Sequence, residues 1–345
     1  MNSFGNKYRI QLFGESHGPA IGVVIDGVPA GIPIYAQDFS SDLERRAGGK
    51  KGGTPRVEKE AIEFLSGIFN NLTTGAPLAV IVRNLNTRSA DYDNLKSVPR
   101  PGHADFVTAI KHNGYADPRG GGHHSGRVTL ALVIAGVIAK KILGANNELG
   151  TNNSLGANNS LGTNNEKEIN SIQIESKILS IGGENPWEQK LDEALEKGDS
   201  LGGVIECTVT NLPAGLGEPF FDSLESIISH LVFAIPGIRG IEFGDGFKAA
   251  QMWGSQHNDP ITGKQGKTSK NGSGGINGGI SNGNPLVFRV AVKPTSSISL
   301  PQQTINMKTG AIENLIVEGR HDTCFALRVP VVLESATAIA LANLI

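Results

Sequence analysis

Cysteine and aromatic residues are scarce in this sequence of 345 residues, and each scarcity excludes a class of protein. The only two cysteines, Cys207 and Cys324, lie far apart without CxxC spacing, which argues against a disulfide framework or a cysteine metal cluster. Aromatic residues make up 6% of the chain, too few for the stacking platforms that bind single-stranded nucleic acid.

Charge and long apolar runs are also limited. Charged residues amount to 19% and the net charge is −2, so bulk charge does not indicate a nucleic-acid partner. The first 18 residues contain no apolar signal core, and the apolar run at 130–138 is too short to cross a bilayer. We therefore expect a cytoplasmic protein with reduced thiols that binds neither nucleic acid nor a membrane.

Glycine is abundant, and it is concentrated in one informative stretch. Residues 99–127, PRPGHADFVTAIKHNGYADPRGGGHHSGR, hold four of the eight histidines, three arginines and the run Gly120-Gly121-Gly122. Histidine transfers protons near neutral pH, arginine binds phosphate and carboxylate oxygens, and glycine lets the backbone approach a ligand. A flexible loop with surface histidines is the alternative interpretation. The density of these residue types favours a site for a phosphorylated ligand.

The periodicity of apolar residues predicts a mixed α+β fold. Alternating or β-branched runs predict strands at 8–13, 21–25, 77–83, 204–209 and 285–292. Helical patterns predict helices at 38–46, with Asp38 as its cap, and at 125–143, 186–197, 223–235 and 330–344.

The chain also contains two kinds of internal repetition. A shift of 184 residues places 14–32 over 198–216 with seven identities, and GAPLAVIV at 75–82 parallels GNPLVFRV at 283–290. We infer a single domain (1–345) built from two related halves, about 1–143 and 186–345. Residues 144–165 are a hexapeptide repeat with too few apolar residues for a β-helix core, so we expect a low-complexity insertion.

Several side chains are candidates for acid catalysis on an anionic substrate. The candidates for proton transfer are His17, His103 and Asp322, and those for anion binding are Arg45, Arg46, Lys50, Lys51, Arg56, Arg127 and Arg320. Structural roles are the alternatives: a hydrogen bond for His17, a helix end for Arg45 and Arg46, and a pair with Arg320 for Asp322. No metal site is expected, since HExxH is absent and His123 and His124 would point apart on a strand.

Motifs throughout the chain resemble those of the chorismate synthase family. They are FGESHG (13–18), DGVPAGIP (26–33), DLERR (42–46), RPGHAD (100–105), RGGG (119–122), LPAGLGEP (212–219), GDGF (244–247), GGINGGIS (274–281), KPTSS (293–297) and GRHD (319–322). Together they cover nearly the whole chain outside 144–165 and are weakest from there to about 197.

The resemblance implies a fold and a reaction. The fold would be a β-α-β sandwich of two pseudo-twofold-related halves around central helices, assembled as a homotetramer. The reaction would be the anti 1,4-elimination of phosphate from 5-enolpyruvylshikimate 3-phosphate to give chorismate, in the shikimate pathway of aromatic amino acid biosynthesis. It would need reduced FMN without net redox change. Although NADP is associated with the family, no nicotinamide fingerprint is visible, so an external flavin reductant is expected.

The resemblance also implies roles for individual residues. His17 would protonate the leaving phosphate, His103 would stabilise the reduced flavin, and Asp322 with Ser16 and Ser125 would assist removal of the C6 proton. The residues implied for substrate binding are Arg46, Lys51, Arg56, Arg127 and Arg320. Those implied for flavin binding are His123, His124, Ser125, Pro236, Gly237, Gly278, Lys293, Pro294, Thr295, Ser296, Ser297 and Arg320.

The sequence departs from the family pattern in places, and other functions remain open. HHSGR at 123–127 stands where many members carry RSSAR, and Lys50 or Lys51 stands where many have a second arginine. One alternative is a non-catalytic protein that binds a phosphorylated metabolite or a flavin, but it would be expected to lose His17, His103 or Asp322. Another is an RNA-binding module using the basic loop at 45–56, but it lacks aromatic residues.

Overall fold

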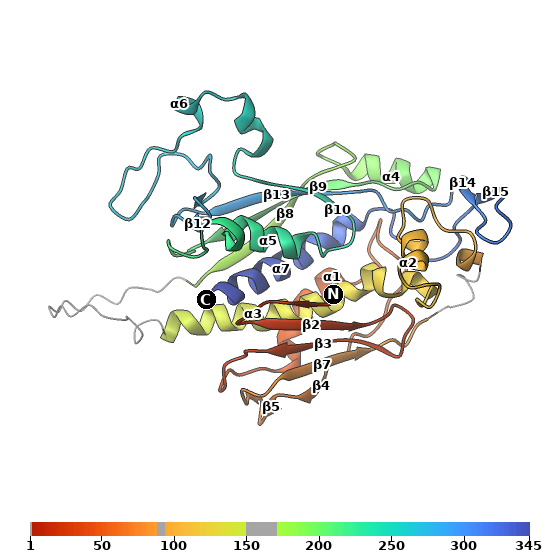
Figure 1. Cartoon of the computed structure of the whole chain (residues 1–345), viewed down its shortest axis with the longest axis horizontal. Helices are drawn as coiled ribbons and strands as arrows, with labels where there is room; N and C mark the ends of the chain where they lie inside the picture. The colour runs from red at the N-terminus through yellow and green to blue at the C-terminus, as the bar shows by residue number, and fades with distance from the viewer. Residues whose placement is uncertain (1, 88–93, 150–170) are drawn as a thin grey trace.

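The computed structural model describes residues 2–87, 94–149 and 171–345. Two antiparallel sheets lie on either side of two long helices, α3 (Thr129–Leu149) and α7 (Val329–Leu344) (Figure 1). The predicted α+β class is confirmed. The predicted insertion lies outside the described residues from position 150 onward.

The first sheet is built from the N-terminal part of the chain. Its strand order is β1-β2-β3-β7-β4, with β1 at Ser3–Phe4, β2 at Arg9–Gly14, β3 at Ala20–Asp26, β4 at Glu63–Ser66 and β7 at Leu78–Arg83. The alternation in β3 buries Ile21, Val23 and Ile25 completely against the helices. A small hairpin joins β5 (Ile68–Phe69) to β6 (Leu72–Thr73).

The second sheet is built from the C-terminal part. Its order is β10-β13-β9-β8, with β8 at Gln173–Ile181, β9 at Gly203–Thr210, β10 at Ile238–Phe243 and β13 at Leu286–Val292. Two further hairpins are β11–β12 (Ile276–Asn277 and Ile280–Ser281) and β14–β15 (Gln302–Ile305 and Ile312–Leu315). The shorter helices are α1 (Ser40–Arg46), α2 (Asp105–Lys111), α4 (Glu188–Lys197), α5 (Leu224–Val232) and α6 (Gly254–His257).

Segments aligned by the internal repeat occupy equivalent strands. β3 and β9 cover the first aligned segment, and β7 and β13 cover the second. Ile21 of β3 pairs with Val82 of β7, and the aligned residues Ile205 and Val290 pair in the second sheet. The flanking strands correspond as well, since β2 and β4 flank the first pair while β8 and β10 flank the second.

The structure changes predicted boundaries of two helices, those at 125–143 and 38–46. The chain enters its first long helix through a 3₁₀ turn, η5 (Gly126–Val128), and α3 continues six residues past the predicted end at 143. A single glycine, Gly144, costs a helix only about 1 kcal/mol, and the alanine, glutamate and leucine that follow favour helix. The predicted cap Asp38 lies inside η1 (Ala36–Phe39), where its carboxylate accepts a hydrogen bond from the Tyr35 N–H (2.8 Å).

The two central helices pack against each other at a point of very close approach. A Cβ placed on Gly136 of α3 would lie 2.3 Å from the Cβ of Ser335 on α7, whose side chain is fully buried. By length and composition, residues Phe325–Leu344 could cross a membrane, but 89% of this segment is buried inside the fold. Its apolar character is therefore explained by packing between the sheets.

We predict that Gly136→Ala lowers the free energy of unfolding by about 1–3 kcal/mol, because an added methyl group forces the two helices apart. Gly144→Ala in the same helix is the matched control. Among the described residues, no atom would lie within 4 Å of a Cβ added at Gly144, so this change should raise the stability by about 0.5–1 kcal/mol. Urea unfolding followed by circular dichroism measures both, and equal midpoints for the two variants would contradict the close packing.

Candidate active site

A cavity of about 650 Å³ opens at the N-terminal ends of the two central helices. Its walls come from both halves of the chain: the β2–β3 turn, the loop after α1, η4 (Arg119–His124) and η5 on one side, and the segments 230–237, 293–297 and 320–328 on the other. This volume lies within the range of about 300–1,000 Å³ that is usual for small-molecule sites.

The cavity is strongly cationic. Seven arginine or lysine side chains line it against three carboxylates: Arg46, Arg56, Arg100, Arg127, Lys293, Arg320 and Arg328 against Glu58, Glu60 and Asp322. Six of the eight histidines line it as well: His17, His103, His123, His124, His230 and His321. The positive ends of the α3 and α7 dipoles add to this potential, so the cavity attracts anions.

The turn between β2 and β3 presents Ser16 and His17 to the cavity. Asn84 fixes this turn, because its side-chain amide donates to the carbonyl oxygens of Glu15 (3.0 Å) and Gly18 (2.8 Å). Arg56 donates to the Ser16 hydroxyl (3.2 Å), and the Ser16 N–H donates to the Gly122 carbonyl (3.0 Å). The hydrogen bonds that fix the backbone of this turn therefore position the His17 imidazole.

The glycine triplet packs directly against two histidines. A Cβ on Gly120 would lie 2.7 Å from the His17 ring, and one on Gly121 would lie 3.3 Å from the ring of His103. Gly120 also has a φ of 61°, in the left-handed region that glycine tolerates. The run GGG thus serves as a thin partition between His17 and His103.

Burial and neighbouring charges set the protonation of His17. Burial lowers its pKa from the usual 6.5, and Arg56 and Arg119 lower it further, while Asp117 opposes them. The imidazole is consequently neutral near pH 7 when no anion is present. A negatively charged group beside it would raise the pKa again.

Three of the predicted anion-binding arginines are tied to two buried glutamates. Glu58 accepts from Arg56 and from Arg127 (3.1 Å), and Glu60 accepts from Arg127 (2.6 Å) and from Arg46. The Glu58 side chain is only 1% exposed. Burial alone would raise the pKa of Glu58, but Arg127, the Leu85 N–H and Arg56 outweigh it and lower the pKa. We refer to these five residues as the arginine–glutamate cluster.

Arg46 is the most deeply placed member of the cluster. Burial lowers its pKa to about 10, an effect that the charge of Glu60 only partly offsets. Its Nε and Nη1 atoms, the Glu60 Oε2 atom and the Thr295 hydroxyl are buried without a hydrogen-bond partner among the described residues. Because buried polar groups are normally paired, these unpaired atoms at the cavity wall indicate the position of a polar ligand or of water.

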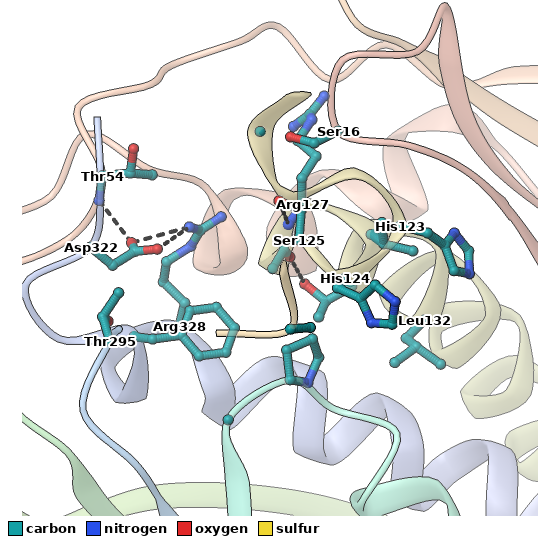
Figure 2. A pocket seen from close by; sticks show the side chains of 18 of the residues that line it. Ser16, Thr54, His123, His124, Ser125, Arg127, Leu132, Thr295, Asp322 and Arg328 are labelled. Atoms are coloured by element: carbon teal, nitrogen blue, oxygen red, sulfur yellow. Dashed lines mark hydrogen bonds and ion pairs between the residues drawn. The ribbon is translucent and has the colours of Figure 1, made fainter. Parts of the chain in front are cut away.

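Asp322 projects toward the cavity but pairs with Arg328 (Figure 2). Arg328 Nη1 lies 3.1 Å from each carboxylate oxygen, and the Thr54 N–H donates to one of them (2.8 Å). The alternative partner considered from the sequence, Arg320, instead donates to the side chain (3.1 Å) and the backbone carbonyl (3.0 Å) of Asn86.

The predicted flavin segments lie around the same cavity. Lys293 and Ser296 donate to the Gly102 carbonyl (2.6 and 2.8 Å), which joins the loop after β13 to the loop that carries His103. His123 lies in η4, where its Nδ1–H donates to the Gly14 carbonyl (2.7 Å). Burial, followed by the charge of His123, lowers the pKa of His124.

The structure brings most of the predicted site residues together but leaves four outside the cavity: Arg45, Lys50, Lys51 and Gly278. Arg45 donates to Glu334 (2.7 Å), and Lys50 donates to the Glu44 carbonyl oxygen (3.2 Å). Lys51 forms a salt bridge with Asp192 of α4 (2.5 Å), which holds its ammonium group away from the cavity. Gly278 lies in the exposed turn of the β11–β12 hairpin. The remaining predicted residues line the cavity, including Ser125, whose hydroxyl accepts from the Arg127 N–H (3.3 Å) (Figure 2), and Pro236 and Gly237.

Three residues of the site described above were missed by the sequence interpretation: Glu58, Glu60 and Arg328. Glu58 and Glu60 follow Arg56 in the run RVEKE, and residues two apart on an extended segment share a face. That spacing could have indicated that Arg56, Glu58 and Glu60 lie on one face and form ion pairs. No local pattern marks Arg328 as the partner of Asp322, because the contact depends on how the chain enters α7.

The fold and the cavity define a class: an α+β protein with a strongly cationic cavity that contains a histidine and a carboxylate. Comparison with known proteins then identifies the family. The profile of the chorismate synthase family, described as "Chorismate synthase", matches residues 8–345.

Curated relatives match over almost their whole length. A chorismate synthase of Chitinophaga pinensis is 54% identical over 99% of this chain and 96% of its own, and one of Dehalococcoides mccartyi is 46% identical over the same shares. A solved structure titled "Crystal Structure of Chorismate Synthase" superposes with a TM-score of 0.70, at 27% identity, over 99% of this chain and 92% of its own. The chain belongs to the chorismate synthase family, and it is therefore a lyase of the shikimate pathway.

We predict that Gly120→Ala lowers enzymatic turnover by about 10²-fold, because the new methyl group would displace the His17 ring and general acids contribute about 10²–10⁴-fold. Gly114→Ala is the matched control, since Gly114 has a similarly positive φ (78°, against 61° at Gly120) and no atom of the described residues within 4 Å of an added Cβ. Turnover and circular dichroism are measured for both. Equal losses in the two variants would point to backbone strain instead of the contact with His17.

Proposed function

We propose that the protein catalyses the anti 1,4-elimination of phosphate from 5-enolpyruvylshikimate 3-phosphate to give chorismate, with reduced FMN bound beside the substrate. The observation that carries this proposal is the presence of His17 and Asp322 on the walls of one arginine-lined cavity. In the overall reaction the C3–O bond breaks with its electron pair leaving on phosphate, the C6 proton is lost, and a second ring double bond forms. Substrate and product stand at the same oxidation level.

His17 acts as the general acid for the departing phosphate. In the anion-free cavity burial and Arg56 keep its pKa below 6.5, so the ring is neutral at pH 7. A phosphate dianion beside it favours the imidazolium form and raises this pKa. At a pH between the pKa of His17 in the free protein and its pKa in the complex, substrate binding is therefore accompanied by uptake of a proton. This proton is delivered to the leaving phosphate. The contribution of the protonated imidazole is lost as the pH rises above the pKa of His17 in the complex.

The arginines bind the anionic groups of the substrate. Arg46, Arg56, Arg127 and Arg320 face a cavity that excludes bulk water from much of their surface, where charge-assisted hydrogen bonds are strong. The Nε and Nη1 atoms of Arg46 have no partner among the described residues, while Nη2 is bound to Glu60. Positive charge at this position stabilises the negative charge that develops on the phosphate.

Asp322 assists removal of the C6 proton, together with Ser16 and Ser125. Arg328 and the Thr54 N–H hold its carboxylate toward the cavity. Ser16 and Ser125 line the same space and provide hydroxyl groups that can relay or position a proton. The Asp322 carboxylate thus assists loss of the C6 proton, and the His17 imidazole assists departure of the phosphate.

The cavity fits a flavin as well as the substrate. Leu132, Phe325 and Pro236 supply apolar wall, and the buried, unpaired Thr295 hydroxyl in the 293–297 loop is available for a polar ring atom. His123–Ser125, Gly237 and Arg320 would complete the contacts, and His103 would stabilise the negative charge of the reduced ring. Reduced FMN supplies the reversible electron source that the reaction requires without net oxidation.

We also propose a homotetramer in the cytoplasm, supplied with reduced flavin by a separate reductant. Large apolar side chains support assembly, because Phe220, Phe221, Phe247 and Trp253 are between 77% and 92% exposed. The two buried free thiols, Cys207 and Cys324, are compatible with a reducing compartment.

We further propose that the two halves are related by a pseudo-twofold axis as a β-α-β sandwich. The matching registers of β3 with β7 and of β9 with β13 support it, as do the equivalent flanking strands. The relation would bring the start of each central helix, α3 and α7, to the same cavity.

Turnover under anaerobic conditions tests the proposed reaction. Protein, 5-enolpyruvylshikimate 3-phosphate and chemically reduced FMN should release phosphate and form chorismate in equal amounts, while the flavin remains reduced. Oxidised FMN kept free of reductant is the control and should give no product. Equal rates with flavin left out would contradict the proposal.

A further inference from the structure

His103, which lines the cavity just before α2, forms a hydrogen-bonded trio with Arg100 and Asp105. The His103 Nδ1 atom lies 2.5 Å from Asp105 Oδ1 and 3.0 Å from Arg100 Nη2. Arg100 also donates through Nε to Asp105 Oδ2 (2.7 Å) and through Nη2 to Oδ1 (2.8 Å). The Arg100 side chain is 4% exposed and that of Asp105 is 13% exposed.

The contacts decide which nitrogen of His103 carries the proton. A guanidinium can only donate hydrogen bonds and an ionised carboxylate can only accept them. Nδ1 therefore cannot accept from Arg100 while it donates to Asp105, and the shorter contact, at 2.5 Å, is the one to Asp105. Arg100 donates through Nε and Nη2 to the same carboxylate, so it keeps a charged acceptor without the imidazole.

Asp105 is ionised in this setting. Burial alone would raise its pKa, but hydrogen bonds from Arg100 and His103 outweigh burial and hold the pKa well below its usual value. Arg100 is fixed in turn by its donation to the buried Ser297 hydroxyl (3.0 Å), at the end of the 293–297 loop. The trio thus links the imidazole to the segment proposed to hold the flavin.

The other edge of the His103 ring lies on the side away from Asp105, on a residue that lines the cavity. The atoms of His103 nearest to a Cβ on Gly121 are Cε1 (3.3 Å) and Nε2 (3.4 Å), so this edge lies against the glycine partition, away from Asp105. A histidine whose Nδ1–H is held by a carboxylate presents Nε2 to its ligand and is better able to carry positive charge there.

We propose that Asp105 is a positioning residue that fixes His103 in the Nδ1–H form and presents Nε2 to the cavity. The identity of the ligand at Nε2, the reduced flavin, rests on the proposed function. Asp105 itself does not line the cavity, so it acts through His103.

Solid-state NMR on sedimented, ¹⁵N-histidine-labelled protein without ligand tests the tautomer. The protonated and bare nitrogens of a neutral imidazole have well-separated shifts, and the His103 signals are identified by their loss in His103→Ala. The wild type should show Nδ1 protonated. In Asp105→Asn, Arg100 becomes the only charged group beside Nδ1, and as a donor it should shift His103 to the Nε2–H form. A bare Nδ1 in the wild type, or no change in Asp105→Asn, overturns the proposal.

Two further variants separate positioning from a general loss of structure. Asp105→Glu keeps the carboxylate and should retain the Nδ1–H form. Asp245→Asn is the matched control, because Asp245 contacts Nδ1 of His257 (3.1 Å) outside the cavity. It should change the His257 signals and leave those of His103 as in the wild type.

Flavin binding connects the tautomer to function. Asp105→Asn should weaken the binding of reduced FMN by about tenfold relative to oxidised FMN, because only the reduced ring carries the added negative charge that a carboxylate-paired imidazole would stabilise. It should lower kcat while leaving KM for the phosphorylated substrate nearly unchanged, since the arginine–glutamate cluster is intact. Equal weakening of both redox forms overturns the role of Asp105. If the wild type binds no flavin, the proposed function fails, whereas the NMR result still decides the tautomer.

Discussion

The arginine–glutamate cluster is the interaction on which the cavity depends. Arg46, Arg56 and Arg127 come from three different segments, and three guanidinium groups would repel one another if they were brought together alone. Glu58 and Glu60 neutralise two of the three charges and bind the arginines in fixed orientations. Because breaking a buried ion pair leaves an uncompensated charge, each member holds the others in place. One net positive charge remains for a ligand.

The central helices explain why this cluster lies where it does. Arg127 belongs to η5 at the start of α3, and Arg328 immediately precedes α7. The close contact between Gly136 and Ser335 holds the two helices at a fixed separation, so their N-terminal ends face the same space. Asp322 and Arg328 are thereby placed opposite Ser16 and Arg127, although they are about 200 to 300 residues apart in sequence (Figure 2).

Much of the fold and of the candidate site could be predicted from the sequence, and the wrong or missing predictions have physical causes. β3, β9, α3 and α7 are strongly periodic or apolar, and the motifs around His17, His103 and Asp322 marked the site. The sequence interpretation missed α2, a helix of only seven residues whose apolar side chains, Phe106, Val107 and Ile110, are exposed and do not pack into the core. It placed Lys51 in the site because no local feature shows that Asp192, from α4, pairs with it. The roles of Glu58, Asp105 and Arg328 likewise depend on partners brought together only by the fold.

The binding of 5-enolpyruvylshikimate 3-phosphate to Glu58→Gln, measured by calorimetry, tests most directly whether the glutamates position the arginines. This change raises the net charge of the cluster by one and keeps the shape of the side chain. If the glutamates serve only to neutralise charge, the anion should bind more tightly. Our account predicts binding weaker by about tenfold, because a hydrogen bond to a charged group is worth about 1.5–3 kcal/mol and Arg56 and Arg127 would lose their fixed acceptor. Glu242→Gln is the control, because Glu242 on β10 also pairs with an arginine, Arg289. This change should leave the affinity unchanged. Affinity for Glu58→Gln equal to or tighter than that of the wild type would contradict the account.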